Sequence, residues 1–252
     1  MRVWLFTTCL TDMFYPQTAA AMIRVLRRLG VEVDYPPNQT CCGQPAYNNG
    51  FFDEARKVAR YTVEVLEGAD AVVIPSSSCC GMIRKHYDDL FEDEPAMARR
   101  AKALADKTFE FVEFLHKRLW DRLSDWPLRY DGMVTYHYSC HLRLLEMTDQ
   151  AEQLLRRIQG LEYRPLAKLD QCCGFGGAFA FRFGQVSAAL VADKVDCIAA
   201  TGAQTVVATD AGCAMNIAGE CKRRGLDVRV RHIADLLDEA MSNGKAPEGV
   251  GT

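Results

Sequence analysis

A cysteine pattern that occurs twice constrains this sequence more than any other feature. Each half of the chain contains one cysteine, then 31 other residues, then a Cys-Cys-Gly triplet, and a last cysteine that is separated from the cysteine pair by 36 or 39 residues. The repeated cysteines are Cys9, Cys41, Cys42 and Cys79 in the first half, and Cys140, Cys172, Cys173 and Cys213 in the second. Self-similarity at a fixed offset is the mark of a repeated structural unit. The chain is therefore predicted to consist of two similar halves.

Short apolar runs and amphipathic stretches alternate in both halves. The runs predict strands at residues 3–7, 31–34, 71–74, 134–138, 163–166, 205–208 and 228–232. The amphipathic stretches predict helices at residues 18–29, 54–66, 149–159, 186–200 and 214–224. Alternating strands and helices favour right-handed crossovers and a parallel sheet covered on both faces. The predicted fold is α/β, with two pseudo-symmetric repeats that are each a small parallel sheet flanked by helices, joined by a helical segment.

The repeat also suggests where the domains begin and end. Residues 1–92 are expected to form the first half-domain, and residues 132–241 the second. The stretch 93–131 is predicted to be a helical bridge and linker: residues 93–126 look entirely helical and have no counterpart in the second half, and residues 127–131 would be the linker. Residues 242–252, which are mainly small and polar, are predicted to be a disordered tail.

Composition excludes several classes of protein. A hydrophobic fraction of 49% and a charged fraction of 25% are typical of a soluble globular chain. The formal net charge of -3 offers no basic field for nucleic acid or anionic lipid. No apolar run approaches the ~18 residues of a membrane span, and the N-terminus lacks the apolar core of about 7–15 residues that a secretory signal needs. We expect a cytoplasmic protein, in which 11 cysteines indicate metal or redox chemistry rather than disulfides.

The eight repeated cysteines are expected to meet at the carboxyl ends of the strands. In each half the first and last cysteines follow strands, and ligands of open α/β sheets gather beyond these strand ends. The glycine after each pair lets a bulky group approach the backbone. Four thiolates suit zinc or an iron–sulfur cluster, and adjacent cysteines favour a cluster over one tetrahedral zinc ion. One or two iron–sulfur clusters per chain are therefore predicted, with zinc and a dithiol or structural role as the alternatives.

The two triplet segments resemble a known family. CCGQPAYNNG and CCGFGGAFAF, each with a cysteine 31 residues upstream and another downstream, are similar to the cysteine-rich CCG domain. That domain occurs in one of the subunits of heterodisulfide reductase, in the glycolate oxidase iron–sulfur subunit and in the lactate utilization protein A family. The resemblance covers nearly the whole chain, and the start VWLFTTCLTDMFYP and the segment QTCCGQPAYN are most similar to the last of these.

This resemblance implies a function for the chain. It implies an iron–sulfur electron-transfer subunit of a complex that oxidises L-lactate, a small 2-hydroxy acid, to pyruvate. The chain would act with two other subunits, one of them a ferredoxin-type iron–sulfur protein. Because this sequence has no ferredoxin-type cysteine run of its own, its electrons must pass through another protein. The alternatives are a subunit of a heterodisulfide reductase-like or glycolate oxidase-like complex and, in another class, a non-enzymatic zinc-bound or apo scaffold.

The resemblance also assigns the cluster ligands. Cys9, Cys41, Cys42 and Cys79 would hold one cluster, and Cys140, Cys172, Cys173 and Cys213 the other. The heterodisulfide reductase pattern ends in Cys-x-x-Cys, whereas Met82 and Asn216 stand three residues after Cys79 and Cys213 here. Four cysteines per site favour an ordinary [4Fe–4S] cluster and make disulfide cleavage doubtful.

Several other residues lie near these cysteines in the sequence. His141, next to Cys140, and Arg182, in the glycine-rich segment after the second triplet, are the weak candidates for a catalytic role. Residues predicted to be structural or packing residues are Cys80, Cys197, Cys221 and His137. The glycines at 174, 176 and 177 lack the G-x-G-x-x-G spacing, so no bound dinucleotide is expected. No catalytic base is identified.

Overall fold

A computed structural model describes residues 1–244 of the chain, and these residues form two compact units. Unit 1 comprises residues 1–114 together with 141–147, and unit 2 comprises residues 115–140 together with the chain from Thr148 onward. The chain therefore passes from one unit to the other three times. Residues 245–252, most of the predicted tail, lie outside the described residues, and Ser242 and Asn243 belong to the last helix.

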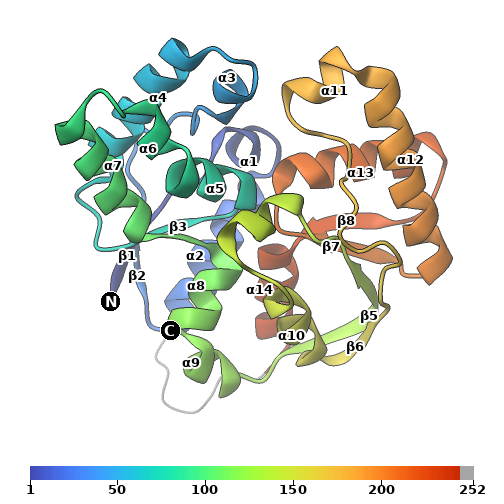
Figure 1. Cartoon of the computed structure of the whole chain (residues 1–252). Coiled ribbons are helices and arrows are strands. Elements are labelled where there is room, and N and C mark those ends of the chain that lie inside the picture. Colours follow the sequence, from blue (N-terminus) through green and yellow to red (C-terminus); the bar gives the residue numbers. More distant parts are fainter. Residues whose placement is uncertain (245–252) are drawn as a thin grey trace. The chain divides into compact units, whose positions relative to one another are not determined.

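Unit 1 contains a sheet of four parallel strands in the order β2-β1-β3-β4 (Figure 1). The strands are β1 (Arg2–Leu5), β2 (Glu32–Asp34), β3 (Val72–Ile74) and β4 (Thr108–Glu110). The helices are α1 (Cys9–Phe14), α2 (Pro16–Arg28), α3 (Gln44–Asn48), α4 (Phe52–Leu66), α5 (Ser77–Lys85), α6 (Tyr87–Leu90) and α7 (Pro95–Asp106), and α8 (Phe111–Arg118) begins in this unit. The two central strands, β1 and β3, are the ones that lead to Cys9 and Cys79.

Unit 2 repeats this sheet with the strand order β6-β5-β7-β8. Its strands are β5 (Arg129–Tyr136), β6 (Gln159–Tyr163), β7 (Thr205–Ala208) and β8 (Arg229–His232). Its helices are α9 (Trp120–Ser124), α10 (Gln150–Arg156), α11 (Ala178–Arg182), α12 (Gly184–Thr201), α13 (Ala211–Arg223) and α14 (Ile233–Asn243). The short 3-10 helix η1 (Cys140–Leu145) starts in unit 2, and from His141 onward belongs to unit 1.

Local sequence explains why these elements form. Helix α2 starts at Pro16, where a missing N–H costs nothing, and its buried side chains follow the 3–4-residue spacing of one helix face. It ends before Gly30, whose φ of 74° suits a left-handed C-terminal position. Strand β3 is a run of three fully buried residues, as expected for a central parallel strand. The cores are thus built where apolar faces of helices cover the sheets.

The segment 141–147 packs into unit 1 through both apolar and polar side chains. Leu142, Leu145 and Met147 are all buried. His141 Nε2 lies 3.0 Å from Gln44 Nε2, and Lys85 Nζ lies 3.9 Å from a Glu146 carboxylate oxygen. These contacts give unit 1 a component that is distant in sequence from the rest of it.

The two four-stranded parallel sheets flanked by helices confirm the predicted α/β fold with two repeats. The prediction that residues 93–126 are entirely helical, with no counterpart in the second half, was wrong. These residues include β4, which pairs in parallel with β3 as β8 pairs with β7. Strand β4 has only three residues and lies between two helices, so its sequence shows no alternation of apolar and polar residues that would identify a strand. It is recognised only by its hydrogen bonds to β3. Similarly, β5 begins at Arg129, within the expected linker.

The predicted strand at residues 163–166 lies earlier in the chain, as β6 at residues 159–163. Pro165 lacks the N–H that a strand would need, so the strand ends before it. Among the described residues, no helix has the length and hydrophobicity needed to cross a membrane.

Two candidate metal centres

Site 1 is formed by the four repeated cysteines of unit 1, which come from three segments of the chain. Cys9 is the first residue of α1, directly beyond β1, and Cys79 is in the first turn of α5, beyond β3. Cys41 and Cys42 lie in the loop between β2 and α3. Since β1, β2 and β3 are parallel neighbours, their carboxyl ends bring these segments to one edge of the sheet.

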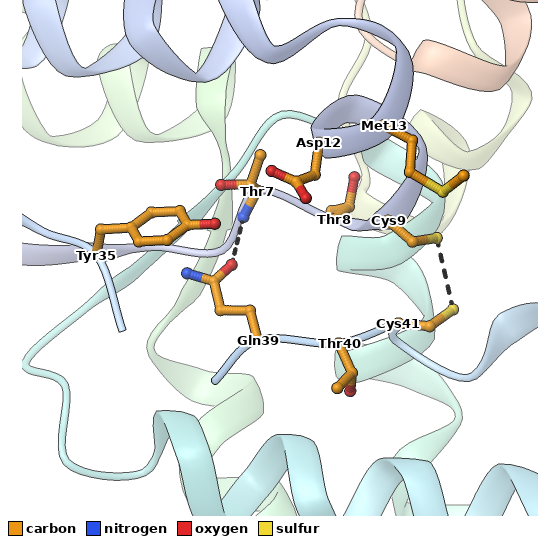
Figure 2. Close-up of a pocket in the computed structure, with 9 residues that line it drawn as sticks. All are labelled: Thr7, Thr8, Cys9, Asp12, Met13, Tyr35, Gln39, Thr40 and Cys41. Carbon is orange, nitrogen blue, oxygen red and sulfur yellow. Dashed lines mark hydrogen bonds between the residues drawn. The ribbon is translucent and has the colours of Figure 1, made fainter. Parts of the chain in front are cut away.

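The sulfurs of site 1 contact one another. Cys9 Sγ and Cys41 Sγ face each other 3.7 Å apart (Figure 2), and the Cys42 thiol is hydrogen-bonded to those of Cys41 and Cys79. Hydrogen bonds from Cys42, from Cys9 and from the Gly43 backbone N–H lower the pKa of the Cys41 thiol to about 3. The same contacts, together with burial, raise the pKa of Cys42 and of Cys9. Site 1 thus stabilises a thiolate at Cys41.

Other residues hold the loop and helix of site 1 in place. Thr62 Oγ1, on α4, donates a hydrogen bond to the Cys41 carbonyl at 3.3 Å. The buried Tyr87 hydroxyl donates to the Cys42 carbonyl at 2.9 Å. The Ser76 hydroxyl accepts a hydrogen bond from the Cys79 backbone N–H at 3.3 Å, which caps α5. These bonds fix the backbone of three of the four cysteines.

Site 2 gathers the repeated cysteines of unit 2 in the same way. Cys140 follows β5, and Cys213 is in the first turn of α13, beyond β7. Cys172 and Cys173 lie in the long connection between β6 and α11. Cys173 Sγ is 3.1 Å from Cys213 Sγ.

Hydrogen bonds polarise the thiols of site 2 as well. Bonds from Cys140, from Cys173 and from the Gly174 backbone N–H lower the pKa of the Cys172 thiol to about 2. The Cys173 contact lowers the pKa of Cys213 to about 7 against the effect of burial, with help from His137. The pKa of Cys173 and that of Cys140 are raised by these thiol contacts and by burial. Each site therefore contains one strongly stabilised thiolate, at the first cysteine of its Cys-Cys-Gly triplet.

The glycine of each triplet is required by the backbone. Gly43 and Gly174 have φ of 87° and 83°, in the left-handed region. A Cβ on Gly174 would lie 2.6 Å from the Ser187 carbonyl oxygen, whereas on Gly43 it would lie 3.4 Å from the Ala55 carbonyl oxygen. Both positions favour glycine for conformation, and Gly174 also for space.

The donor set of each site fits a metal or iron–sulfur group. Four sulfurs converge on one sheet edge, one of them is held as a thiolate, and backbone N–H groups already point at sulfur. Soft sulfur ligands select zinc or iron–sulfur clusters over hard cations. Backbone N–H···S bonds of this kind are among the features that set cluster potentials. The arrangement therefore suits electron transfer or structural metal binding.

His137, which the sequence assigned to a structural role, lies against site 2. Its ring is buried, and a ring nitrogen lies within 4.8 Å of the sulfurs of Cys173 and Cys213. At the equivalent strand position, three residues before the first cysteine, unit 1 has Phe6. The sequence did contain one signal for a role of this histidine at site 2: one repeat has an apolar ring at this position and the other has a polar ring.

The two weak catalytic candidates lie in different surroundings. His141 belongs to unit 1, where its ring contacts Gln44, the residue after the first triplet. Arg182 is exposed at the end of α11. Neither is shown to act in catalysis.

The other residues considered near the cysteines are buried in helices or make hydrogen bonds to the backbone. Asn216 Nδ2 donates to the Cys173 carbonyl at 2.8 Å, so it supports the loop of site 2. Met82 and Cys80 are fully buried on α5, and Cys221 is buried on α13. Cys197 is half-buried on α12.

A cavity of about 220 Å³ lies beside Cys9 and Cys41 in unit 1 (Figure 2). The buried Thr7 hydroxyl lines it and has no hydrogen-bond partner within residues 1–244. The Gln39 side chain is held by a hydrogen bond that its Oε1 accepts from the Thr7 N–H. Asp12 and the Cys41 thiolate are negatively charged groups of the lining. A carboxylate substrate would be repelled by Asp12, so the cavity suits water or a neutral polar molecule better than a 2-hydroxy acid.

Comparison with known proteins agrees with this architecture. The model of the CCG family, described as "Cysteine-rich domain", matches twice, at residues 3–84 and 134–218. Proteins named Lactate utilization protein A from Bacillus licheniformis and Bacillus subtilis are 45% and 42% identical over 239 residues, which cover 94% of this chain and 99% of each relative. The resemblance inferred from the two triplet segments is thus confirmed.

A solved structure shares the fold. The crystal structure of a hypothetical protein from Helicobacter pylori superposes with a TM-score of 0.64 at 11% identity, covering 95% of this chain and 49% of that one. At this identity the likeness concerns the fold alone.

Proposed function

Because the chain belongs to the cysteine-rich CCG domain family, with relatives named Lactate utilization protein A, we propose that it is an iron–sulfur electron-transfer subunit of a cytoplasmic complex that oxidises L-lactate to pyruvate. The observation that carries the proposal is the convergence of four cysteines at the same sheet edge in each of two repeated units. A single repeat with this arrangement would suggest one metal site. Two suggest a pair suited to the two electrons of a 2-hydroxy acid oxidation.

Each site would bind one cluster through its four cysteines. Cys9, Cys41, Cys42 and Cys79 would hold one [4Fe–4S] cluster, and Cys140, Cys172, Cys173 and Cys213 the other. When bound, such clusters supply one-electron acceptor chemistry. The Gly43 and Gly174 N–H groups donate to the neighbouring thiolates and so stabilise negative charge on sulfur.

The proposal requires partner proteins. The sequence contains no ferredoxin-type run, and the cavity beside site 1 does not suit an anionic substrate. We propose that lactate is bound by another protein of the complex, that this chain receives its electrons, and that the same complex contains a ferredoxin-type iron–sulfur protein.

A subunit of a heterodisulfide reductase-like complex is a weaker candidate. The position three residues after Cys79 holds the fully buried Met82, and Asn216, after Cys213, is bonded to a backbone carbonyl. Neither supplies the fifth thiolate of that pattern. A structural zinc site is favoured by one observation, the close grouping of His137 with Cys173 and Cys213. Metal analysis separates zinc binding from cluster binding.

The test is metal analysis of anaerobically purified protein together with three variants. The wild type should contain about eight irons and about eight acid-labile sulfides per chain, as two four-iron clusters require. Cys41→Ser and Cys172→Ser should each lose about half of both, because each removes the polarised thiolate of one site. Cys197→Ser is the matched control, since this half-buried cysteine lies outside both sites, and it should keep the full content.

Electron transfer is tested in the complex reconstituted with its partner subunits. Addition of L-lactate should produce the electron paramagnetic resonance signal of reduced clusters in the wild type and in Cys197→Ser. Stoichiometric zinc without iron after anaerobic reconstitution would overturn the electron-transfer proposal and favour the scaffold. Full iron content in both site variants would overturn the ligand assignment.

A further inference from the structure

The two units can be aligned residue by residue along the helices that support the triplets. Gly43 packs toward the Ala55 carbonyl on α4, and Gly174 toward the Ser187 carbonyl on α12. The buried residues of the two helices then coincide at a constant offset of 132. The pairs are Ala55 and Ser187, Ala59 and Val191, Thr62 and Lys194, Val63 and Val195, and Leu66 and Ile198.

One of these pairs exchanges a neutral residue for a cation. Lys194 is fully buried, although lysine is among the residues least often found in that state. Its ammonium donates to the Lys168 carbonyl at 2.7 Å and to the Leu169 carbonyl at 3.3 Å, in the segment that leads into Cys172. Among the described residues no carboxylate forms an ion pair with it. The ammonium is therefore solvated by backbone oxygens rather than by a directly bonded carboxylate, and Asp170 and Asp193 act on it only through space.

The charge of Lys194 acts on site 2. Helix α12 packs against site 2, because Val191 and Val195 lie in one buried cluster with Cys173 and Cys213. Burial lowers the pKa of the Lys194 ammonium, whereas Cys197, Cys173 and two carboxylates, Asp170 and Asp193, act to raise it. The ammonium therefore interacts electrostatically with a sulfur of site 2. Inside a protein, where the effective dielectric constant is low, such an interaction is far stronger than between exposed groups.

Site 1 lacks this charge. At the equivalent position Thr62 donates a neutral hydroxyl bond to the Cys41 carbonyl. The half-buried guanidinium of Arg84, on α5, is bonded to both carboxylate oxygens of Glu113, at 2.9 and 2.8 Å, so its charge is compensated. The two sites thus share a scaffold but differ by one buried positive charge that no carboxylate of the described residues bonds directly.

We propose that Lys194 gives the site 2 cluster the higher reduction potential of the two, so that site 2 is the first to be reduced. This inference rests on the proposed function, because it presupposes that both sites hold clusters. A cluster gains one negative charge on reduction, and a buried cation beside it stabilises that reduced state. The net exchange moves one electron from a reduced site 1 cluster to an oxidised site 2 cluster, with no bond or proton changed. Lys194 would thereby set the direction in which electrons collect within the chain.

The experiment is a redox titration followed by electron paramagnetic resonance. Cys172→Ser should retain only the site 1 cluster, and Cys41→Ser only the site 2 cluster. Each midpoint potential can therefore be assigned to its site. Electron exchange should favour site 2 by at least about tenfold, which is about 59 mV for one electron. In Lys194→Met the site 2 potential should fall by a similar amount, and the site 1 potential should not move.

Two further variants separate charge from structure. Lys194→Gln removes the charge but keeps a side-chain N–H donor, and should lower the site 2 potential even if Lys194→Met fails to hold its cluster. Lys168→Met removes an exposed lysine paired with Asp193 while leaving its backbone carbonyl in place. Because salt screens exposed charges, its effect should be small and should vanish at high ionic strength.

The outcomes distinguish this inference from the proposed function. Two clusters with equal potentials, or a site 2 potential that stays fixed in both Lys194 variants, would overturn the role of Lys194 while leaving the electron-transfer function intact. Absence of iron from the wild-type protein would overturn the proposed function, and this inference with it.

Discussion

Units 1 and 2 hold their cysteines on the same backbone but surround them with different side chains. Both place the first cysteine after a central strand, the pair in a loop with a left-handed glycine, and the last cysteine in the first turn of a helix. Near these cysteines, Phe6 in unit 1 corresponds to His137 in unit 2, and Cys80 corresponds to Ala214. The difference shows that the positions of the sulfurs depend on topology, whereas their electrostatic surroundings depend on individual side chains that differ between the two units.

Buried ion pairs offer the sharpest way to test this comparison. Arg84 is the guanidinium bonded to the buried Glu113 of unit 1. Arg84→Met should lower the free energy of unfolding of the apo-protein by about 3 kcal/mol, because a buried carboxylate then loses its cation. Urea denaturation under reducing conditions measures this loss.

The matched variant in unit 2 is Arg224→Met. Its buried partner Glu220 keeps two hydrogen bonds from Arg223, at 2.8 and 2.7 Å, so the loss should be about 1 kcal/mol or less. Equal losses in the two variants would show that the second arginine does not compensate, and that the two units respond alike.

The triplet glycines should respond differently to an added methyl group. Gly43→Ala should cost about 1–2 kcal/mol, for the left-handed conformation alone. Gly174→Ala should cost about 1–3 kcal/mol more, because its Cβ would meet the Ser187 carbonyl oxygen at 2.6 Å. Denaturation of the two apo variants measures the difference. If Gly43→Ala proved the more damaging, the packing of α12 against the second triplet would be described wrongly.

Acid should have a smaller effect, concentrated in unit 2. Burial disfavours the charged form of Glu220, but hydrogen bonds from Arg223 and Arg224 outweigh it and hold its pKa below the ordinary value. A carboxyl whose pKa is lower in the folded state stabilises the fold above its unfolded pKa of about 4.3, and this stability is lost as pH falls through the folded value. Stability should therefore drop below about pH 5, and less steeply in Glu220→Gln.

The control for this pH effect is Glu67→Gln in unit 1. Arg100 lowers the pKa of Glu67, but both side chains of that pair are largely exposed. Solvent screening weakens such a pair, so this variant should alter the acid profile less than Glu220→Gln does. If stability fell equally steeply with pH in the two variants, the loss of stability in acid could not be attributed to Glu220.

The sequence predicted the parts of the fold that depend on local patterns. The cysteine repeat and the apolar runs identify the two parallel sheets, and Thr205–Ala208 is a strand with the expected bounds. The three-residue strand β4 is not predictable in this way, since it is defined by pairing with β3.

The same limit applies to the candidate sites. The eight cysteines could be picked out because their spacing repeats. Lys194 and His137 could not, because their importance depends on which groups they approach in the fold. The available signal was a lysine on the apolar face of a predicted helix, at a position where the other repeat has a threonine.

The threefold passage of the chain between the units has a consequence for any division of the gene into two parts. Unit 1 is complete only with residues 141–147, which lie beyond the first cysteine of the second repeat. A gene split between the two repeats would therefore encode a first fragment without His141 and the buried leucines that follow it. Two chains divided at that point would separate unit 1 from part of its own core.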